Sequence, residues 1–340
     1  MPENITPTNA SGGMEPNRRA GKVSKYHIPH YVAPLDETPL KAVDAVEETS
    51  KPLSMWAEAW RSLRKQPLFI ISVIMILAVL FVAALPGVLT GNDPLQCDLM
   101  NSNSPATEGH PMGFNFQGCD IYSRVIYGTR ASLLVGVMTT IFVVIIGGSI
   151  GALAGYYGGW LDAVLARIGD IFFALPLILG AIIVMQLPAF RENKSVWTVI
   201  VTLTIFGWPQ VARIARGAVI ESRAADYVKA SRALGLSKFS ALVKHVIPNS
   251  LAPIIVIATV NLGIYIVAEA TLSFLGIGLP PDVMSWGNDI AAAQTQLRNN
   301  PWVLFWPALF LSATVLSFIM LGDAVRDALD PKSRKGPSHG

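Results

Sequence analysis

Charged residues are scarce in this chain of 340 residues, of which only 14% are Asp, Glu, Lys or Arg and 52% are hydrophobic. A soluble domain of ordinary composition carries about 25% charged residues. The deficit is uneven, because long charge-free windows alternate with short segments that hold nearly all of the charge. This pattern excludes one large soluble core and indicates a membrane protein.

Strict alternation of apolar and polar residues is also missing from the apolar windows, which argues against barrel strands and favours helices. About 20 apolar residues are needed to cross the hydrocarbon layer as a helix. The sequence therefore predicts an all-α membrane protein with six spans. The predicted spans are 68–89, 131–157, 171–190, 195–212, 249–268 and 299–322.

Sequence motifs for several chemistries are absent. The chain has no GxxxxGK[ST] phosphate loop, no HExxH or GxSxG sequence and no paired carboxylates within the spans. It therefore offers no candidate catalytic or metal-binding residues and no P-loop for ATP. We expect a protein that is not an enzyme, and any energy for its action has to come from another polypeptide.

Only two cysteines occur, Cys97 and Cys119, and both fall in the segment 90–130 between the first two spans. No CxxC or histidine spacing accompanies them, so a metal site is disfavoured. They are either two unrelated free thiols or a disulfide, which would persist on the oxidising side of a membrane.

The distribution of basic residues predicts the orientation. With the N-terminus on the cytoplasmic side, the inner segments near the spans carry 16 Lys and Arg residues and the outer segments carry 5. By the positive-inside rule, both termini face the cytoplasm. The net charge of +3 follows from this asymmetry and requires no nucleic-acid partner.

The N-terminal part reads as two segments. Residues 1–50 lack apolar periodicity and are predicted to form a disordered cytoplasmic tail. In 51–67, Trp56, Trp60 and Leu63 share one helical face, while the basic residues point elsewhere. Indole rings and basic heads suit the headgroup zone, so this amphipathic helix is expected to lie on lipid at the inner leaflet.

Glycines recur every four residues in the second span, at Gly147, Gly151 and Gly155. A stripe of small residues lets two helices approach closely in lipid. Packing within this chain is the favoured interpretation, and a contact between two subunits is the alternative.

The segment 213–248 carries seven basic residues and is the longest inner loop. It predicts a short helix from Tyr227 to Leu234, a break at Gly235, and a second helix that ends before Pro248. In that second helix Leu236, Phe239, Leu242, Val243 and Val246 recur at helical spacing and are expected to pack. Taken alone, the segment could be an ordinary helical hairpin on the membrane surface.

The residues of this loop resemble the EAA loop of ABC importer permeases. The resemblance rests on Ala230-Ser231, on Gly235 four residues after Ser231, and on Ile247-Pro248. Lys229 stands where the general pattern has an acidic residue. The oligopeptide and dipeptide branch resembles this chain in having a basic residue there. The resemblance implies a coupling helix that docks on a cytoplasmic ATPase. It assigns that role to Lys229, Ala230, Ser231, Arg232, Gly235 and Pro248.

Other segments resemble the same branch, and together the resemblance covers roughly residues 54–333. They are HPMGFNFQGCDIYSRVIYGTRASL before the second span, GYYGGWLDAVLARIGDIFFALP after it, EATLSFLGIGLPPDVMSWG and LGDAVRDALDP. Cys119 replaces the arginine that the family usually has. The resemblance implies a type I importer domain over 129–327, followed by a cytoplasmic tail over 328–340.

From the resemblance we expect half of a translocation channel in a bacterial cytoplasmic membrane. The implied partners are a second, similar permease, two ATPases that bind ATP and magnesium, and an extracytoplasmic substrate-binding protein. The chain itself would hold no cofactor. Peptides are the branch's commonest cargo, and nickel chelates, glutathione and some sugars are also carried. The alternatives are a secondary transporter, or a membrane scaffold without ATPase partners.

Two polar residues in the fifth apolar region are candidates for the solute pathway. Asn261 lies within the predicted span and Glu269 follows a charge-free run of 20 residues. A carboxylate inside a membrane has to be paired, hydrated or protonated, which makes it a functional candidate. Glu269 could equally lie at the outer water interface, and a packing hydrogen bond is favoured for Asn261.

Overall fold

The computed structural model describes residues 55–329, so the predicted tail 1–50 and nearly all of 328–340 lie outside the described part. Within 55–329 the regular elements are helices, joined by loops that contain three isolated β-bridges. Five of these helices are long and apolar enough to cross a membrane. They are α2 (Pro67–Ala84), α4 (Ile121–Tyr157), α8 (Val196–Arg223), α11 (Ile247–Phe274) and α13 (Trp302–Leu329).

Shorter helices complete the described part. They are α1 (Met55–Leu63), α3 (Pro86–Leu89), α5 (Gly159–Ala174), α6 (Leu177–Met185), α7 (Pro188–Arg191), α9 (Asp226–Ala233), α10 (Lys238–Ala241) and α12 (Trp286–Ala293). The predicted all-α membrane fold is confirmed.

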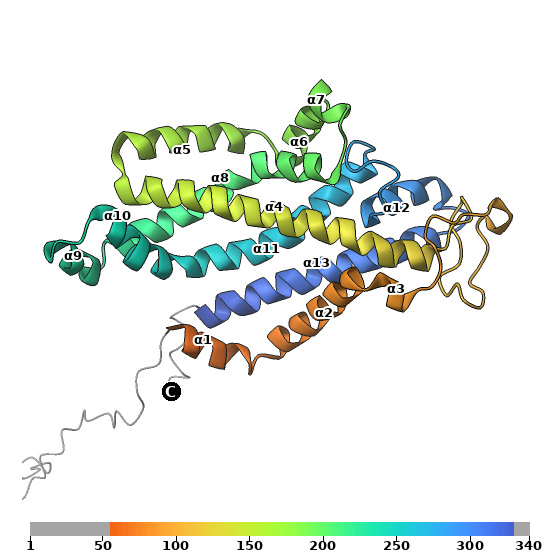
Figure 1. Ribbon diagram of the computed structural model, residues 1–340, viewed down its shortest axis with the longest axis horizontal. Helices are drawn as coiled ribbons and strands as arrows, with labels where there is room; N and C mark the ends of the chain where they lie inside the picture. Colours follow the sequence, from red (N-terminus) through yellow and green to blue (C-terminus); the bar gives the residue numbers. More distant parts are fainter. Residues whose placement is uncertain (1–54, 330–340) are drawn as a thin grey trace, which may run out of the picture. The chain divides into compact units, whose positions relative to one another are not determined.

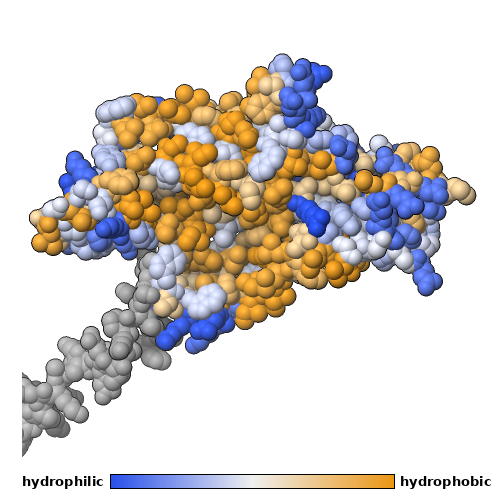
Figure 2. Space-filling model, in the orientation of Figure 1, coloured by the Kyte–Doolittle hydropathy of each residue, from blue (hydrophilic) through white to orange (hydrophobic). Residues whose placement is uncertain are grey.

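The long helices pack side by side (Figure 1), with α4 against α8 and α11, and α13 against α11 and α2. Buried apolar side chains such as Val135, Leu203 and Leu272 fill the space between α4, α8 and α11. The visible surface is mostly apolar over the middle of the bundle and hydrophilic toward its two ends (Figure 2). This distribution matches a bundle whose middle lies in hydrocarbon and whose ends lie in water.

The third predicted span, 171–190, is not one helix. The chain instead forms α5 and α6, which are bent by 85° relative to each other. Pro176 causes the break, because its ring removes a backbone donor and keeps the preceding residue out of helical geometry. Leu175 is extended accordingly, with φ −104° and ψ 121°.

Other helices are longer than the charge-free windows. Helix α4 begins at Ile121, so the last ten residues of the predicted loop 90–130 are helical. Helix α8 runs past 212 to Arg223, which shortens the predicted inner loop 213–248. The windows stop at charged residues, whereas Arg124 and Arg216 find partners and remain in the helices.

The amphipathic segment 51–67 contains α1, and Leu63, one of the three residues predicted to face lipid, packs on the chain instead. Ala59 and Leu63 are buried against Ala324 and Ala328 of α13. Trp56 and Trp60 are 43% and 53% exposed and do not share this contact. The tryptophans are therefore left free for the headgroup zone, while the smaller residues anchor α1 to the end of α13.

The glycine stripe of α4 lies directly against α8. A Cβ atom on Gly147 would lie 2.5 Å from the carbonyl oxygen of Trp208, and one on Gly155 would lie 2.7 Å from that of Arg216. A Cβ atom on Gly151 would overlap the carbonyl oxygen of Ala212. Backbone meets backbone here, so the structure places the stripe in a contact within this chain.

We predict that Gly151→Leu destabilises the bundle by about 3 kcal/mol, because rigid backbone cannot move aside for the added side chain. Gly148→Leu is the matched control, since Gly148 has no atom within 4 Å of an added Cβ. Thermal unfolding of both variants in detergent measures the difference. Equal melting temperatures would show that α4 and α8 are not held by this contact.

Candidate functional site

Helix α9 ends in a tight turn that contains Gly235. The amide of Leu236 donates to the carbonyl of Ser231 at 3.2 Å, and the amide of Gly235 donates to that of Arg232 at 3.0 Å. Gly235 has φ +94°, a left-handed conformation in which a side chain is strained. This pair of bonds is the Schellman arrangement, which stops α9 and reverses the chain.

The loop has one face on the bundle and one face in solvent. Val228, Leu242 and Val246 are buried against Tyr156 of α4 and Val219 of α8. Leu234 is 89% exposed. The loop thus projects from the bundle on a buried base, and Leu234 gives it an exposed apolar tip.

The expected packing of the second helix is only partly correct. Leu242 and Val246 are buried as predicted, but Phe239 and Val243 are 64% and 45% exposed. The helix also does not end before Pro248. A π-helical turn over Leu242–Val246 leads directly into α11, which begins at Ile247. A wide turn beside a helix start tolerates Pro248, whose missing amide needs no partner there.

Five of the six predicted coupling residues lie together in α9 and the turn after it, whereas Pro248 lies in the first turn of α11. Lys229, Ala230, Arg232 and Gly235 are exposed and Ser231 is half-buried, with its hydroxyl donating to the carbonyl of Val228 at 2.8 Å. A cavity of about 760 Å³ lies between α9 and the end of α4, beside the contact of Val228 with Tyr156. Its basic lining residues are Arg223, Lys229, Arg232 and Lys238.

Ion pairs tie α5 to the C-terminal half of α8. Arg216 binds both carboxylate oxygens of Asp162, and Arg213 lies 3.5 Å from Asp170. The guanidinium of Arg213 also stacks 3.8 Å from the ring centroid of Phe173. Because α5 is separated from α6 by the sharp bend, these contacts set where α5 lies against α8.

Glu269 is enclosed in the bundle. Its side chain accepts hydrogen bonds from Ser132 of α4 at 3.0 Å and from Ser273 at 2.9 Å, and none of its surface is exposed. Ser132 in turn accepts a bond from the amide of Trp286, the first residue of α12. This network joins three helices, so the geometry describes a packing contact within the chain.

Asn261 is also buried, with 1% of its surface exposed. Its amide lies 3.5 Å from the hydroxyl of Tyr265, and its side-chain oxygen has no hydrogen-bond partner within residues 55–329. A role for Asn261 or Glu269 in a solute pathway stays a prediction. Among the described residues, no group of His, Cys, Asp and Glu side chains is arranged to hold a metal ion.

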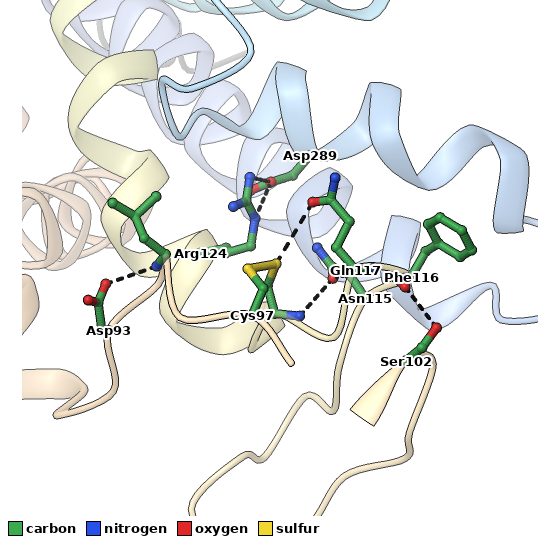
Figure 3. Close-up of a disulfide and its surroundings, with 10 residues drawn as sticks. Asp93, Cys97, Ser102, Asn115, Phe116, Gln117, Arg124 and Asp289 are labelled. Atoms are coloured by element: carbon green, nitrogen blue, oxygen red, sulfur yellow. Dashed lines mark hydrogen bonds and ion pairs between the residues drawn. A yellow bond between two sulfur atoms is a disulfide. The ribbon is translucent and has the colours of Figure 1, made fainter. Parts of the chain in front are cut away.

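The segment before α4 lies at the end of the bundle opposite α9 (Figure 1). Of the two alternatives for the cysteines, the structure has the Cys97–Cys119 disulfide (Figure 3). Next to it, Arg124 of α4 points at Asp289 of α12, with its Nη2 2.6 Å and its Nε 2.8 Å from Oδ1. The two side chains are only 13% and 10% exposed. Burial raises the pKa of Asp289, and Arg124 opposes that rise.

A second buried carboxylate starts α4. Asp120 is the N-cap and accepts bonds from the amide and the hydroxyl of Ser123. His110 lies with its Nδ1 3.4 Å from Asp120. In the sequence HPMGFNFQGCDIYSR, Asp120 thus caps the first turn of α4 through Oδ2, while its Oδ1 is buried without a hydrogen-bond partner in the described residues.

Comparison with known families settles which class of protein has this arrangement. Residues 147–335 match the family model for the binding-protein-dependent transport system inner membrane component. Residues 54–106 match the N-terminal membrane domain of oligopeptide transport permease C. The chain belongs to the family of binding-protein-dependent transport system inner membrane components.

Several similar permeases align with this chain over most of its length and over most of their own. The oligopeptide transport system permease protein OppC of Bacillus subtilis is 36% identical over 86% of this chain and 95% of its own length. The dipeptide permease DppC of the same organism is 36% identical over 88% and 92%. The glutathione permease GsiD of Pectobacterium atrosepticum is 34% identical over 82% and 91%.

A solved structure shares the fold. An inward-facing form of the MetNI methionine ABC transporter superposes with a TM-score of 0.52 and 21% sequence identity. It covers 61% of this chain and 96% of that chain. The type I importer fold inferred from the resemblance is therefore confirmed.

The Arg124–Asp289 pair is the main polar contact that the sequence did not predict. The two residues are separated by 165 positions, and each looked like part of an extramembrane loop. The only sequence signal was that Arg124 lies within a segment resembling the family, whereas Asp289 lies two residues beyond the nearest such segment. Their pairing depends on α12 folding back onto the start of α4.

We predict that Arg124→Met destabilises the permease by about 3–5 kcal/mol at neutral pH, because it leaves a buried carboxylate without a partner. Without Arg124 the pKa of Asp289 rises further. The loss of stability should therefore shrink as the pH falls through that raised pKa and the carboxyl becomes neutral. Unfolding measured from pH 8 to pH 5 follows this effect.

The double variant Arg124→Met/Asp289→Leu is the matched control, since it removes both charges and should regain most of the stability. A double variant as unstable as Arg124→Met would contradict the pairing.

Proposed function

We propose that this permease forms half of the translocation channel of an ATP-driven importer of peptides. A second, similar permease completes the channel. Two cytoplasmic ATPases bind ATP and magnesium, and an extracytoplasmic binding protein delivers the solute. The chain lies in a bacterial cytoplasmic membrane with both termini in the cytoplasm, holds no cofactor and catalyses no reaction itself.

The observation that carries the proposal is the projecting loop α9–α10 on its buried base. Its exposed apolar tip, Leu234 and Phe239, suits a groove on a partner protein. Its base is fixed to α4 and α8 through Val228, Leu242 and Val246. A force applied to the tip is therefore transmitted to two long helices instead of bending a loose loop.

The residues at the two ends of the helical bundle support the proposed orientation in the membrane. The C-terminal ends of α4 and α13 lie with the basic loop and with α1, and the disulfide-closed segment lies at the other end (Figure 1). Placing the basic end in the cytoplasm satisfies the positive-inside rule. It also puts the disulfide on the oxidising side.

The substrate class rests on the named relatives. They are permeases for oligopeptides, dipeptides and glutathione, which are all short chains that contain amide bonds. We therefore expect uptake of short peptides in preference to sugars or metal chelates. Competition for uptake of a labelled tripeptide by these three classes measures the preference.

Gly235→Val tests the coupling loop. A Cβ-branched side chain at φ +94° is strained, so the turn after α9 should open and uptake should fall about tenfold or more. Gly217→Val is the control, because Gly217 lies within α8 without a positive φ or a close neighbour. Peptide uptake and ATPase copurification are measured in cells with equal amounts of each variant.

Wild-type uptake by Gly235→Val would overturn the coupling role of this turn. Failure of the wild-type chain to copurify with two ATPases would overturn the importer itself, and uptake that continues without them would favour a secondary transporter.

A further inference from the structure

A cavity on the side of the bundle has no role in the proposed transport cycle. It lies between α2 and α13, which run side by side (Figure 1), and it has a volume of about 380 Å³. Met75, Val79 and Val82 of α2 form one wall, and Leu309 and Ala313 of α13 form the other. The rest of the lining consists of Ala78, Phe310, Thr314, Thr129 of α4 and Trp286 of α12. Because the lining is mostly apolar, water is a poor occupant.

A basic side chain lies at one end of this cavity. Arg130 of α4 follows Thr129, which lines the cavity, and is exposed. Its Nε donates to the carbonyl of Ala83 at 2.7 Å and its Nη2 to that of Ala84 at 2.9 Å. These are the last carbonyls of α2, so the guanidinium is held just beyond Val82, where the cavity ends.

The dimensions fit a lipid that stands upright in the bilayer. From Val82 to Met75 the wall extends about 10 Å along α2, at 1.5 Å per residue. With its headgroup beside Arg130, a phospholipid would place an acyl chain along the cavity from Val82 toward Met75. The carbonyls of Ala83 and Ala84 take two of the five N–H groups of Arg130, and the other three, on Nη1 and Nη2, are left to donate to a phosphate.

A transmembrane helix of a partner accounts less well for Arg130 at the end of this cavity. Anionic side chains are rare in membrane-spanning helices, so such a helix would offer the guanidinium no counter-ion, whereas a phospholipid supplies its phosphate. An acyl chain also gains free energy with each buried methylene.

We propose that this cavity binds one phospholipid, with a fatty acyl chain between α2 and α13 and its phosphate on Arg130. The lipid seals the gap beside α2, which otherwise buries little of its own surface; Leu77 and Ile74 of this helix are 59% and 61% exposed. The site is separate from the coupling loop and does not depend on the transported solute.

The test is native mass spectrometry of the assembled importer released from membranes in mild detergent. We expect one retained phospholipid per copy of this chain. Ala78→Phe/Ala313→Phe fills the cavity and should abolish retention, whereas Leu77→Phe adds a ring on the outer face of α2 and should not. Arg130→Gln should weaken retention about fivefold.

A photoactivatable acyl chain on a phospholipid gives a second readout on the wild-type complex. Cross-links within 75–82 and 309–314 support the site, and they do not require that any variant folds. Equal lipid retention by the filled variant and the wild type would overturn the proposal. Cross-links confined to other segments would overturn it as well, as would a partner helix found in the cavity.

Discussion

The contact between α4 and α8 is the constraint on which the rest of the permease depends. Three glycines bring the α4 backbone against the α8 backbone, and no side chain larger than hydrogen fits between them. The same pair of helices supplies the base of the α9–α10 loop and the arginines that hold α5. The interface between α4 and α8 therefore positions both the α9–α10 loop and the bent third span.

Much of this architecture could be predicted from residue patterns. Charge-free windows locate the hydrophobic middle of each span, because no charge is tolerated there without a partner. The four-residue glycine period predicted a close helix contact, and Gly235 predicted the chain reversal after α9. These signals are local, since each depends on residues within one or two turns of one another.

Features that depend on distant partners could not be predicted in this way. Arg124 lies inside α4 because Asp289 neutralises it, and no local pattern reveals that pairing. The 85° bend was missed because the apolar run continues across Pro176 without interruption. The hydrogen bonds of Glu269 could not be predicted either, because Ser132, which lies 137 positions away in the chain, donates one of them, and its pathway role stays a prediction. Burial of a polar group depends on such tertiary contacts, which composition alone does not encode.

Because its base is buried against α4 and α8, the α9–α10 loop is expected to move as one body with these two helices. Spin labels on Leu234→Cys at the loop tip and Leu134→Cys on the exposed face of α4 measure this directly in the assembled importer, since both native cysteines are held in the disulfide. The account predicts one distance between these labels, unchanged between nucleotide-free and ATP-bound states. A distance that changes when ATP binds would show that the loop moves independently of α4 and would contradict the account.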